Sequence, residues 1–265
     1  MIGCLLSIFV TSCNNNIRKS SQIVRSDKLV DIGTHKLRVI LSDIPSEYTI
    51  VLEAGGGNYS DAYQGIQDTL AKTTGMRVMS YDRSGFGHSE FGPDVWEAKD
   101  DVEALKKCLK ILNINDKLIL VGHSYGGFLA QYFADLYPEM ISGIVLLDPM
   151  NVKFVDKFGF DKISAATPRL ENPITDGDRA INRLIDFVQI SFDSMRGKEL
   201  PTQIPVSLIT VEHTPYGADE IWRTSHTKML INSEKHKLII AHENSHDIIN
   251  ENPELVLSTI LELIN

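Results

Sequence analysis

The chain is poor in cysteine and in positive charge. Its 265 residues include only three cysteines, Cys4, Cys13 and Cys108, too few for a disulfide framework. The formal net charge is −9 at neutral pH, and the isoelectric point is near 5.4. A surface that binds nucleic acid needs a basic face, so we expect no nucleic-acid partner.

The N-terminal segment lacks an apolar run long enough to cross a bilayer. Its apolar run, Ile2–Val10, is too short for a spanning helix. It continues into Val10-Thr11-Ser12-Cys13 and a polar stretch, a pattern that resembles the lipobox of bacterial lipoprotein signal peptides. The resemblance implies acylation of Cys13, with residues 1–27 as leader and tether and the protein anchored in the cell envelope. No Lys or Arg precedes the run, so the alternative is an unprocessed N-terminal segment on a cytoplasmic protein.

From Lys28 onward, the pattern is that of one packed α/β domain, residues 28–265. Lys28–Ile32 and Lys36–Leu41 flank a glycine turn and predict an antiparallel hairpin. Short apolar runs then predict buried strands at Thr49–Glu53, Met76–Ser80, Lys117–Val121, Gly143–Leu147, Val206–Val211 and Lys237–Ala241. Helices are predicted between them at Gln64–Thr73, Trp96–Leu112, Phe128–Tyr137 and Glu254–Ile264. This alternation favours a mostly parallel central sheet with helices on both faces.

One segment is too long for an ordinary connection between strands. Residues 151–203 separate two predicted strands and contain a helical stretch, Arg179–Ile190. We therefore predict a helical cap insertion over the C-terminal edge of the sheet.

The most informative motif is Gly122-His123-Ser124-Tyr125-Gly126, a G-x-S-x-G sequence between a predicted strand and a predicted helix. That context is the one a nucleophile elbow requires, in which a tight turn exposes the serine hydroxyl. The N-terminal N–H groups of the following helix then face whatever binds beside the serine. The motif predicts Ser124 as a nucleophile; the alternative is a structural turn with a solvent-facing serine.

Two other loops follow predicted strands. One is the glycine-rich Glu53–Gly57, and the other is Asp82–Ser89, of the form D-x-x-G-x-G-x-S. The second is not a dinucleotide fingerprint, because Glu90 stands where the third glycine of G-x-G-x-x-G is required. We expect no cofactor.

With Asn244–Ile248 after the last strand, these motifs occur in the order typical of the α/β-hydrolase superfamily, which the chain resembles from Lys28 to Asn265. The resemblance implies that Ser124 is the nucleophile and His246 the catalytic histidine. It also implies that the backbone N–H groups of Gly56 and Tyr125 form the oxyanion hole. Because the nucleophile position holds serine and not aspartate, the haloalkane dehalogenase and epoxide hydrolase chemistries are not expected.

The sequence leaves open which carboxylate is the acid of the implied triad. In most relatives the acid follows the strand that matches Val206–Val211, but Thr214 occupies its position here. A subset of relatives carries it one strand earlier, where this chain has Asp148. We expect Asp148 to hold His246 in the correct tautomer, with Glu212 and Asp219 as alternatives.

The implied function is metal-free hydrolysis of an ester, a lactone or a related small acyl substrate through an acyl-enzyme intermediate. An aminopeptidase or a carbon–carbon bond hydrolase would use the same residues. A non-catalytic ligand-binding relative is the remaining alternative. The oligomeric state does not follow from the sequence.

Overall fold

The computed structural model describes residues 23–214, 216–230 and 233–264. The predicted leader and Cys13 lie outside these residues. The first strand, β1 (Val24–Asp31), begins before Lys28, so the last residues assigned to the tether belong to the sheet. Ion pairs from Arg25 to Asp68 and from Asp27 to Arg38 connect this early part of β1 to the domain.

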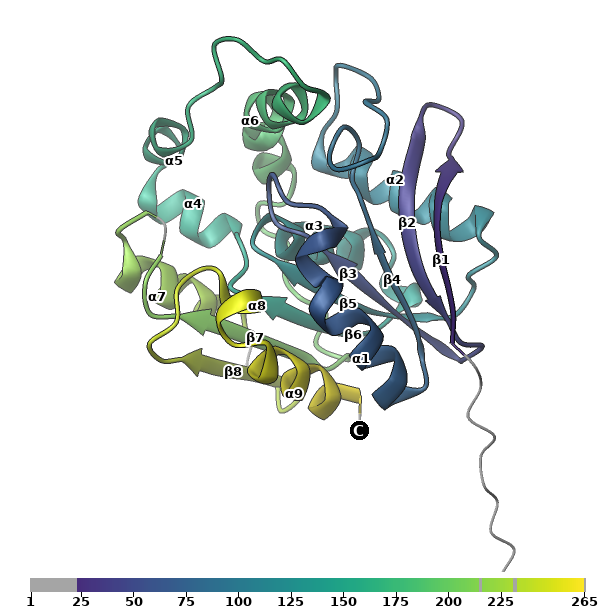
Figure 1. Cartoon of the computed structure of the whole chain (residues 1–265). Helices are drawn as coiled ribbons and strands as arrows, with labels where there is room; N and C mark the ends of the chain where they lie inside the picture. Colours follow the sequence, from purple (N-terminus) through teal and green to yellow (C-terminus); the bar gives the residue numbers. More distant parts are fainter. Residues whose placement is uncertain (1–22, 215, 231–232, 265) are drawn as a thin grey trace, which may run out of the picture.

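The core is an eight-stranded sheet with the order β1-β2-β4-β3-β5-β6-β7-β8 (Figure 1). After β1, the strands are β2 (Lys36–Asp43), β3 (Tyr48–Glu53), β4 (Arg77–Tyr81), β5 (Lys117–His123), β6 (Ile141–Leu147), β7 (Val206–Val211) and β8 (His236–Ala241). Strand β2 pairs antiparallel with β1 and β4, and the other neighbours are parallel. The predicted mostly parallel sheet is confirmed.

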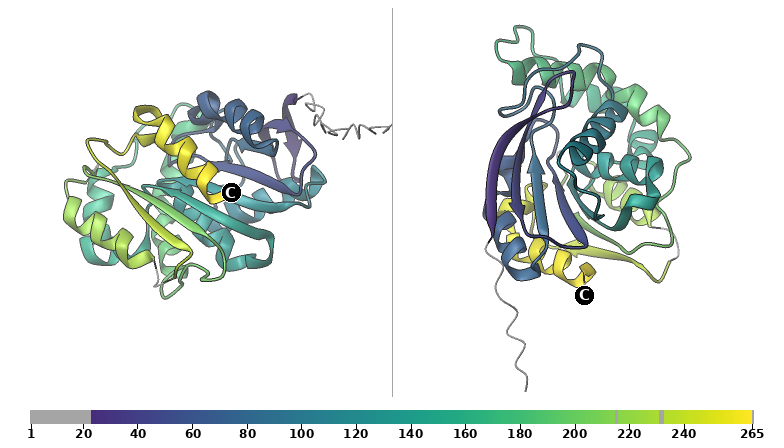
Figure 2. Two further views of the ribbon diagram at one scale, coloured as in Figure 1. Left: turned by 90° about the horizontal axis from the view of Figure 1, so that it is seen from below. Right: turned by 90° about the vertical axis from the view of Figure 1, so that its right-hand side faces the viewer.

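Helices cover both faces of this sheet, as Figure 2 shows. The α-helices of the described residues are α1 (Gln64–Thr74), α2 (Ala98–Ile111), α3 (Tyr125–Leu136), α4 (Val152–Phe158), α5 (Phe160–Ala166), α6 (Asp176–Ser194), α7 (Asp219–Met229), α8 (Ile248–Glu251) and α9 (Pro253–Ile264). Side chains alternate along each strand, so Val51 belongs to the core under α2 and α3 while Ile50 belongs to the core under α1 and α9. Both faces are apolar, which explains the uninterrupted apolar runs in the sequence.

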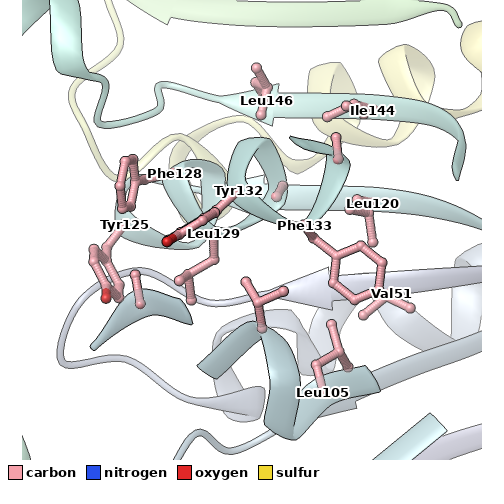
Figure 3. Close-up of a cluster of buried hydrophobic side chains, with 14 of the residues drawn as sticks. Val51, Leu105, Leu120, Tyr125, Phe128, Leu129, Tyr132, Phe133, Ile144 and Leu146 are labelled. Atoms are coloured by element: carbon pink, nitrogen blue, oxygen red, sulfur yellow. The ribbon is translucent and has the colours of Figure 1, made fainter. Parts of the chain in front are cut away.

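Helix α3 is the central helix of the first core. Its side chains Phe128, Leu129 and Phe133 pack against Val51 and Leu120 of the sheet (Figure 3). The helix begins at Tyr125, three residues before the predicted start at Phe128. Gly126 and Gly127 therefore belong to the helix. Larger residues do not fit at these positions, because a Cβ at Gly126 would meet the backbone of Glu53 and one at Gly127 would meet Pro149.

The long connection between β6 and β7 forms α4, α5 and α6, beyond the C-terminal ends of the central strands (Figure 1). Helix α6 is longer than its predicted stretch and begins with a capping box between Thr175 and Asp178. Four helices have no predicted stretch of their own: α4 and α5 lie inside the predicted cap segment, whereas α7 and the short α8 lie outside it. Among the described residues, no helix has both the length and the apolar character needed to cross a membrane.

Candidate active site

Ser124 lies in the sharp turn between β5 and α3. Its backbone has φ 52° and ψ −118°, a conformation that side-chain-bearing residues rarely adopt. The turn closes only because of its glycines: a Cβ at Gly122 would collide with the backbone of Gly126, and one at Gly126 with the backbone of Glu53. The strain is local, and it lifts the Ser124 hydroxyl out of the end of the sheet.

The structure brings Ser124, His246 and Asp148 together from three segments far apart in the sequence. Ser124 Oγ lies 2.8 Å from His246 Nε2, and His246 Nδ1 lies 2.6 Å from Asp148 Oδ2. A carboxylate oxygen only accepts, so Nδ1 carries the proton and donates it to Asp148. Nε2 is then the free acceptor that receives the hydroxyl proton of Ser124.

Asp148 follows β6 and is fully buried, with a positive φ of 45°. Its other oxygen, Oδ1, accepts from the Trp222 indole N–H at 2.7 Å and from the Val211 backbone N–H at 3.1 Å. Burial alone would raise the pKa of Asp148, but the hydrogen bonds from His246 and Trp222 hold it below its ordinary value. The carboxylate is therefore charged although it is buried.

Two further histidines pack beside this group, and both are neutral. The ring of His123 donates from Nε2 to the backbone carbonyl of His246 at 2.7 Å, which helps to fix the loop that carries His246. Burial, and next the charge of His246, lowers the pKa of His123 to about 4. The ring of His226 donates from Nε2 to the Pro149 carbonyl, and burial likewise lowers its pKa.

The alternative acids lie elsewhere. Glu212 accepts from His242 Nδ1 at 2.8 Å and from the Glu243 backbone N–H at 2.9 Å. Asp219 accepts from the Thr214 backbone N–H at 2.8 Å, so it stabilises the turn before α7. His246 has its hydrogen bond to Asp148 and not to either of these acids.

Gly56 and Tyr125 line the same cavity as Ser124. The cavity has a volume of about 190 Å³ and lies between the end of the sheet and the helices α5 and α6. Tyr125 is the first residue of α3, where a backbone N–H has no partner one turn back in its own helix. The N–H of Tyr125 is therefore available to a group bound beside Ser124.

Three buried residues near these groups were missed by sequence analysis. Trp222 and His226 lie on α7 four positions apart, and that helix had not been predicted. In the sequence, Arg83 is distinguished only as part of the loop Asp82–Ser89, yet its guanidinium donates to the backbone carbonyls of Ala54 and Gly55 at 2.5 and 2.6 Å. No spacing rule connects Arg83 to the glycine-rich loop, because the contact is made only by the fold.

Within the described ranges, no group of three or more side chains is arranged to hold a metal ion. A larger groove, of about 680 Å³, lies at the surface beside α2. It is lined by charged residues of both signs, and Ser124 is not among its lining residues.

The chain matches one family model and is similar to several known proteins. A family model described as "alpha/beta hydrolase fold" matches residues 48–164. The uncharacterized protein YqjL of Bacillus subtilis is 25% identical over 82% of this chain and 84% of its own length. The crystal structure of E-2-(acetamidomethylene)succinate hydrolase has a TM-score of 0.68 at 17% identity and covers 91% of this chain and 99% of its own.

Other similarities are local. A proline iminopeptidase of Saccharolobus solfataricus is 32% identical over 99 residues, which are 37% of this chain and 31% of that protein. The probable transporter efuK of Hormonema carpetanum is 33% identical over 45% of this chain. The match spans only 18% of efuK.

Proposed function

The chain belongs to the α/β-hydrolase superfamily, and from that premise we propose that it is a serine hydrolase that cleaves a small ester or lactone. The observation that carries the proposal is the continuous hydrogen-bond chain from Asp148 through His246 to Ser124. It ends at a strained serine that opens into a cavity.

In the proposed reaction, Ser124 Oγ attacks the carbonyl carbon while His246 Nε2 takes the hydroxyl proton. Charged Asp148 stabilises the imidazolium that forms. The tetrahedral intermediate collapses to an acyl-serine, and Nε2 returns the proton to the departing alcohol. Water then repeats the sequence in place of Ser124, which releases the acid and restores the hydroxyl.

The oxyanion hole of this proposal consists of the backbone N–H groups of Gly56 and Tyr125. Both residues line the cavity at Ser124. Donors of this kind stabilise the charge that develops on the carbonyl oxygen, and the loss of one typically lowers kcat by about 10²–10³.

An aminopeptidase would use the same groups, and the local similarity to proline iminopeptidases is the reason to consider it. Recognition of a substrate ammonium group needs a carboxylate near the nucleophile. The residues that line the cavity include none within the described chain, which favours an uncharged acyl substrate. A carbon–carbon bond hydrolase or a ligand-binding relative would also fit this fold.

The test measures labelling by an active-site reagent and hydrolysis of a short ester. The wild type is expected to react with a fluorophosphonate at Ser124 and to hydrolyse p-nitrophenyl acetate, and Ser124→Ala is expected to lose both. Ser258→Ala, which changes an exposed serine of α9, serves as the control. If Ser124→Ala keeps more than a few per cent of wild-type turnover, the nucleophile is wrongly assigned. A folded wild type with neither labelling nor turnover supports the ligand-binding alternative.

We also propose that Cys13 is acylated and that the protein is anchored to the bacterial envelope. Support comes only from the lipobox-like sequence before it. Wild-type protein is expected to incorporate labelled palmitate and to fractionate with membranes, whereas Cys13→Ser is expected to do neither. Unlabelled wild-type protein that retains residues 1–12 contradicts the proposal.

A further inference from the structure

The cavity at Ser124 is mostly apolar, and among the described residues its lining includes no charged side chain. Helix α6 contributes one face of apolar side chains at helical spacing, and α5 contributes another set. The apolar lining residues from these two helices are Phe160, Ile163, Ile181, Leu184, Ile185, Val188 and Phe192. Tyr216 also lines the cavity, and burial raises its pKa to about 12, so it stays neutral.

The residues around the cavity also indicate which half of an ester it would hold. A leaving alcohol has to lie beside His246, because Nε2 returns the proton to it. Within the described chain, the lining includes Gly56 and Tyr125, on the oxyanion side, but not His246. Because the lining lies away from the atom that returns the proton, the cavity is better placed to hold the group that stays on Ser124 than the leaving alcohol.

The volume limits the size of that group. An apolar protein cavity of about 150 Å³ holds a benzene ring. A cavity of about 190 Å³ therefore accommodates a chain of about six to eight carbon atoms. A charged group there would lose its hydration without gaining an ionic partner from the lining.

We propose, on the basis of the proposed function, that this cavity is an acyl pocket that selects uncharged aliphatic acyl groups of about six to eight carbons. Burial of each further methylene is expected to raise kcat/KM by about threefold to fourfold until the pocket is full. Dicarboxylic monoesters of equal length are rejected.

The experiment measures kcat/KM for p-nitrophenyl acetate, butyrate, hexanoate, octanoate and decanoate, with the monoester of adipic acid as the charged match for hexanoate. The wild type is expected to prefer hexanoate or octanoate to acetate by at least tenfold, and to prefer hexanoate to the adipate monoester by a similar factor. Val188→Phe, which fills the pocket, is expected to lower the hexanoate-to-acetate ratio at least tenfold. Ile190→Phe adds the same ring to an exposed position of α6 and is expected to leave that ratio unchanged.

The outcomes separate this proposal from the one it rests on. Labelled, active enzyme that prefers acetate, or accepts the adipate monoester as well as hexanoate, overturns the acyl pocket alone. Equal ratios in Val188→Phe and wild type also overturn it. Absence of labelling and of all turnover overturns the hydrolase itself.

A second and independent observation concerns Arg83. Its guanidinium is buried and donates to the carbonyls of Ala54 and Gly55, and it lies 5.5 Å from the ring centre of Tyr125. In a planar trans peptide, the carbonyl of Gly55 and the N–H of Gly56 point in opposite directions. A donor that fixes the carbonyl therefore fixes where the N–H points.

We infer that Arg83 is a positioning residue that aims the Gly56 N–H at the developing oxyanion. Lysine keeps the charge but not the two-pronged geometry, so Arg83→Lys is expected to lower kcat about tenfold to a hundredfold, with KM within about twofold. Arg77→Lys is the matched control, because Arg77 bonds Asp43 and Asp116 away from the cavity.

Turnover is measured per fluorophosphonate-labelled site, so that a partly unfolded sample does not mimic a slow enzyme. Unchanged kcat in Arg83→Lys overturns the inference. A loss that appears in KM, or only in the labelled fraction, also overturns it, since that is what a purely structural role produces.

Discussion

The C-terminal ends of β6 and β7 each carry a carboxylate paired with a histidine. After β6, Asp148 lies 2.6 Å from His246, and after β7, Glu212 lies 2.8 Å from His242. The two distances hardly differ, but the surroundings do. The Asp148 and His246 side chains are 0% and 24% exposed, whereas those of Glu212 and His242 are 33% and 72% exposed.

The comparison shows that a short distance between a histidine and a carboxylate does not by itself identify a catalytic site. The His246 ring continues to Ser124, and Asp148 is held by donors from Trp222 and Val211. Glu212 instead accepts from the backbone of Glu243, which stabilises the turn after β8. An exposed pair of this kind contributes little, because water screens it.

The largest expected effect comes from removing one carboxylate at a time. Asp148→Asn is expected to lower kcat by as much as ~10⁴, because the amide no longer secures the tautomer in which His246 Nε2 is free. Glu212→Gln is expected to stay close to wild type. Steady-state kinetics per labelled Ser124 measures both, and a reversed order would move the acid to the end of β7.

The local sequence pattern does not by itself distinguish between these two acids. Both residues directly follow an apolar strand, so the pattern treats them alike. Strand order decides what each can reach: β6 pairs with β5, which ends one residue before Ser124, and β7 is one strand further away. Asp148 also has a positive φ, which composition does not reveal.

The fold itself was largely predictable. Each buried strand is a short apolar run, and a run of that kind is visible without knowledge of its neighbours. Helix α7 was not predicted, because its residues, among them Thr224 and His226, have modest helix propensity and a mixed pattern. The helix is held by tertiary contacts such as the bond from Trp222 to Asp148, which a local pattern does not contain.

A smaller effect is expected from Trp222→Phe, which keeps a ring but removes one donor from Asp148. A hydrogen bond to a charged group is worth about 1.5–3 kcal/mol, so its loss corresponds to roughly tenfold to a hundredfold in activity. We expect kcat to fall within that range while KM changes little, since Trp222 is not among the residues that line the cavity.

The control is the other tryptophan of the chain. Trp96 donates to Asp101 at 2.8 Å, so Trp96→Phe removes an equivalent bond elsewhere. If kcat falls by the same factor in both variants, Trp222 acts through general packing. The hydrogen bond from Trp222 to Asp148 would then not explain the difference between the Asp148 and Glu212 pairs.

The last prediction concerns stability instead of turnover, and it extends the comparison to a third carboxylate, Glu53, at the end of β3. Glu53 is buried like Asp148, but among the described residues its Oε1 accepts a hydrogen bond only from the Tyr81 hydroxyl and its Oε2 accepts none, with Arg83 Nη1 4.0 Å from Oε2. Burial raises its pKa from 4.5 to about 7, although the charge of Arg83 and the Tyr81 bond oppose the rise. With fewer donors than Asp148, the same kind of group shifts in the opposite direction.

The raised pKa has a definite sign in a stability profile. Between pH 4.5 and about 7 the folded state holds a proton on Glu53 that the unfolded state has released, so this group lowers the free energy of unfolding as pH rises. Glu53→Gln lacks that slope. The variant is therefore expected to gain up to about 3 kcal/mol relative to wild type over this window, and no more above it. Urea unfolding at several pH values measures the gain, with exposed Glu234→Gln as the control. If the difference in the free energy of unfolding between Glu53→Gln and wild type stays constant across the window, Glu53 is charged in the folded state. The smaller number of hydrogen-bond donors would then not make its pKa differ from that of Asp148.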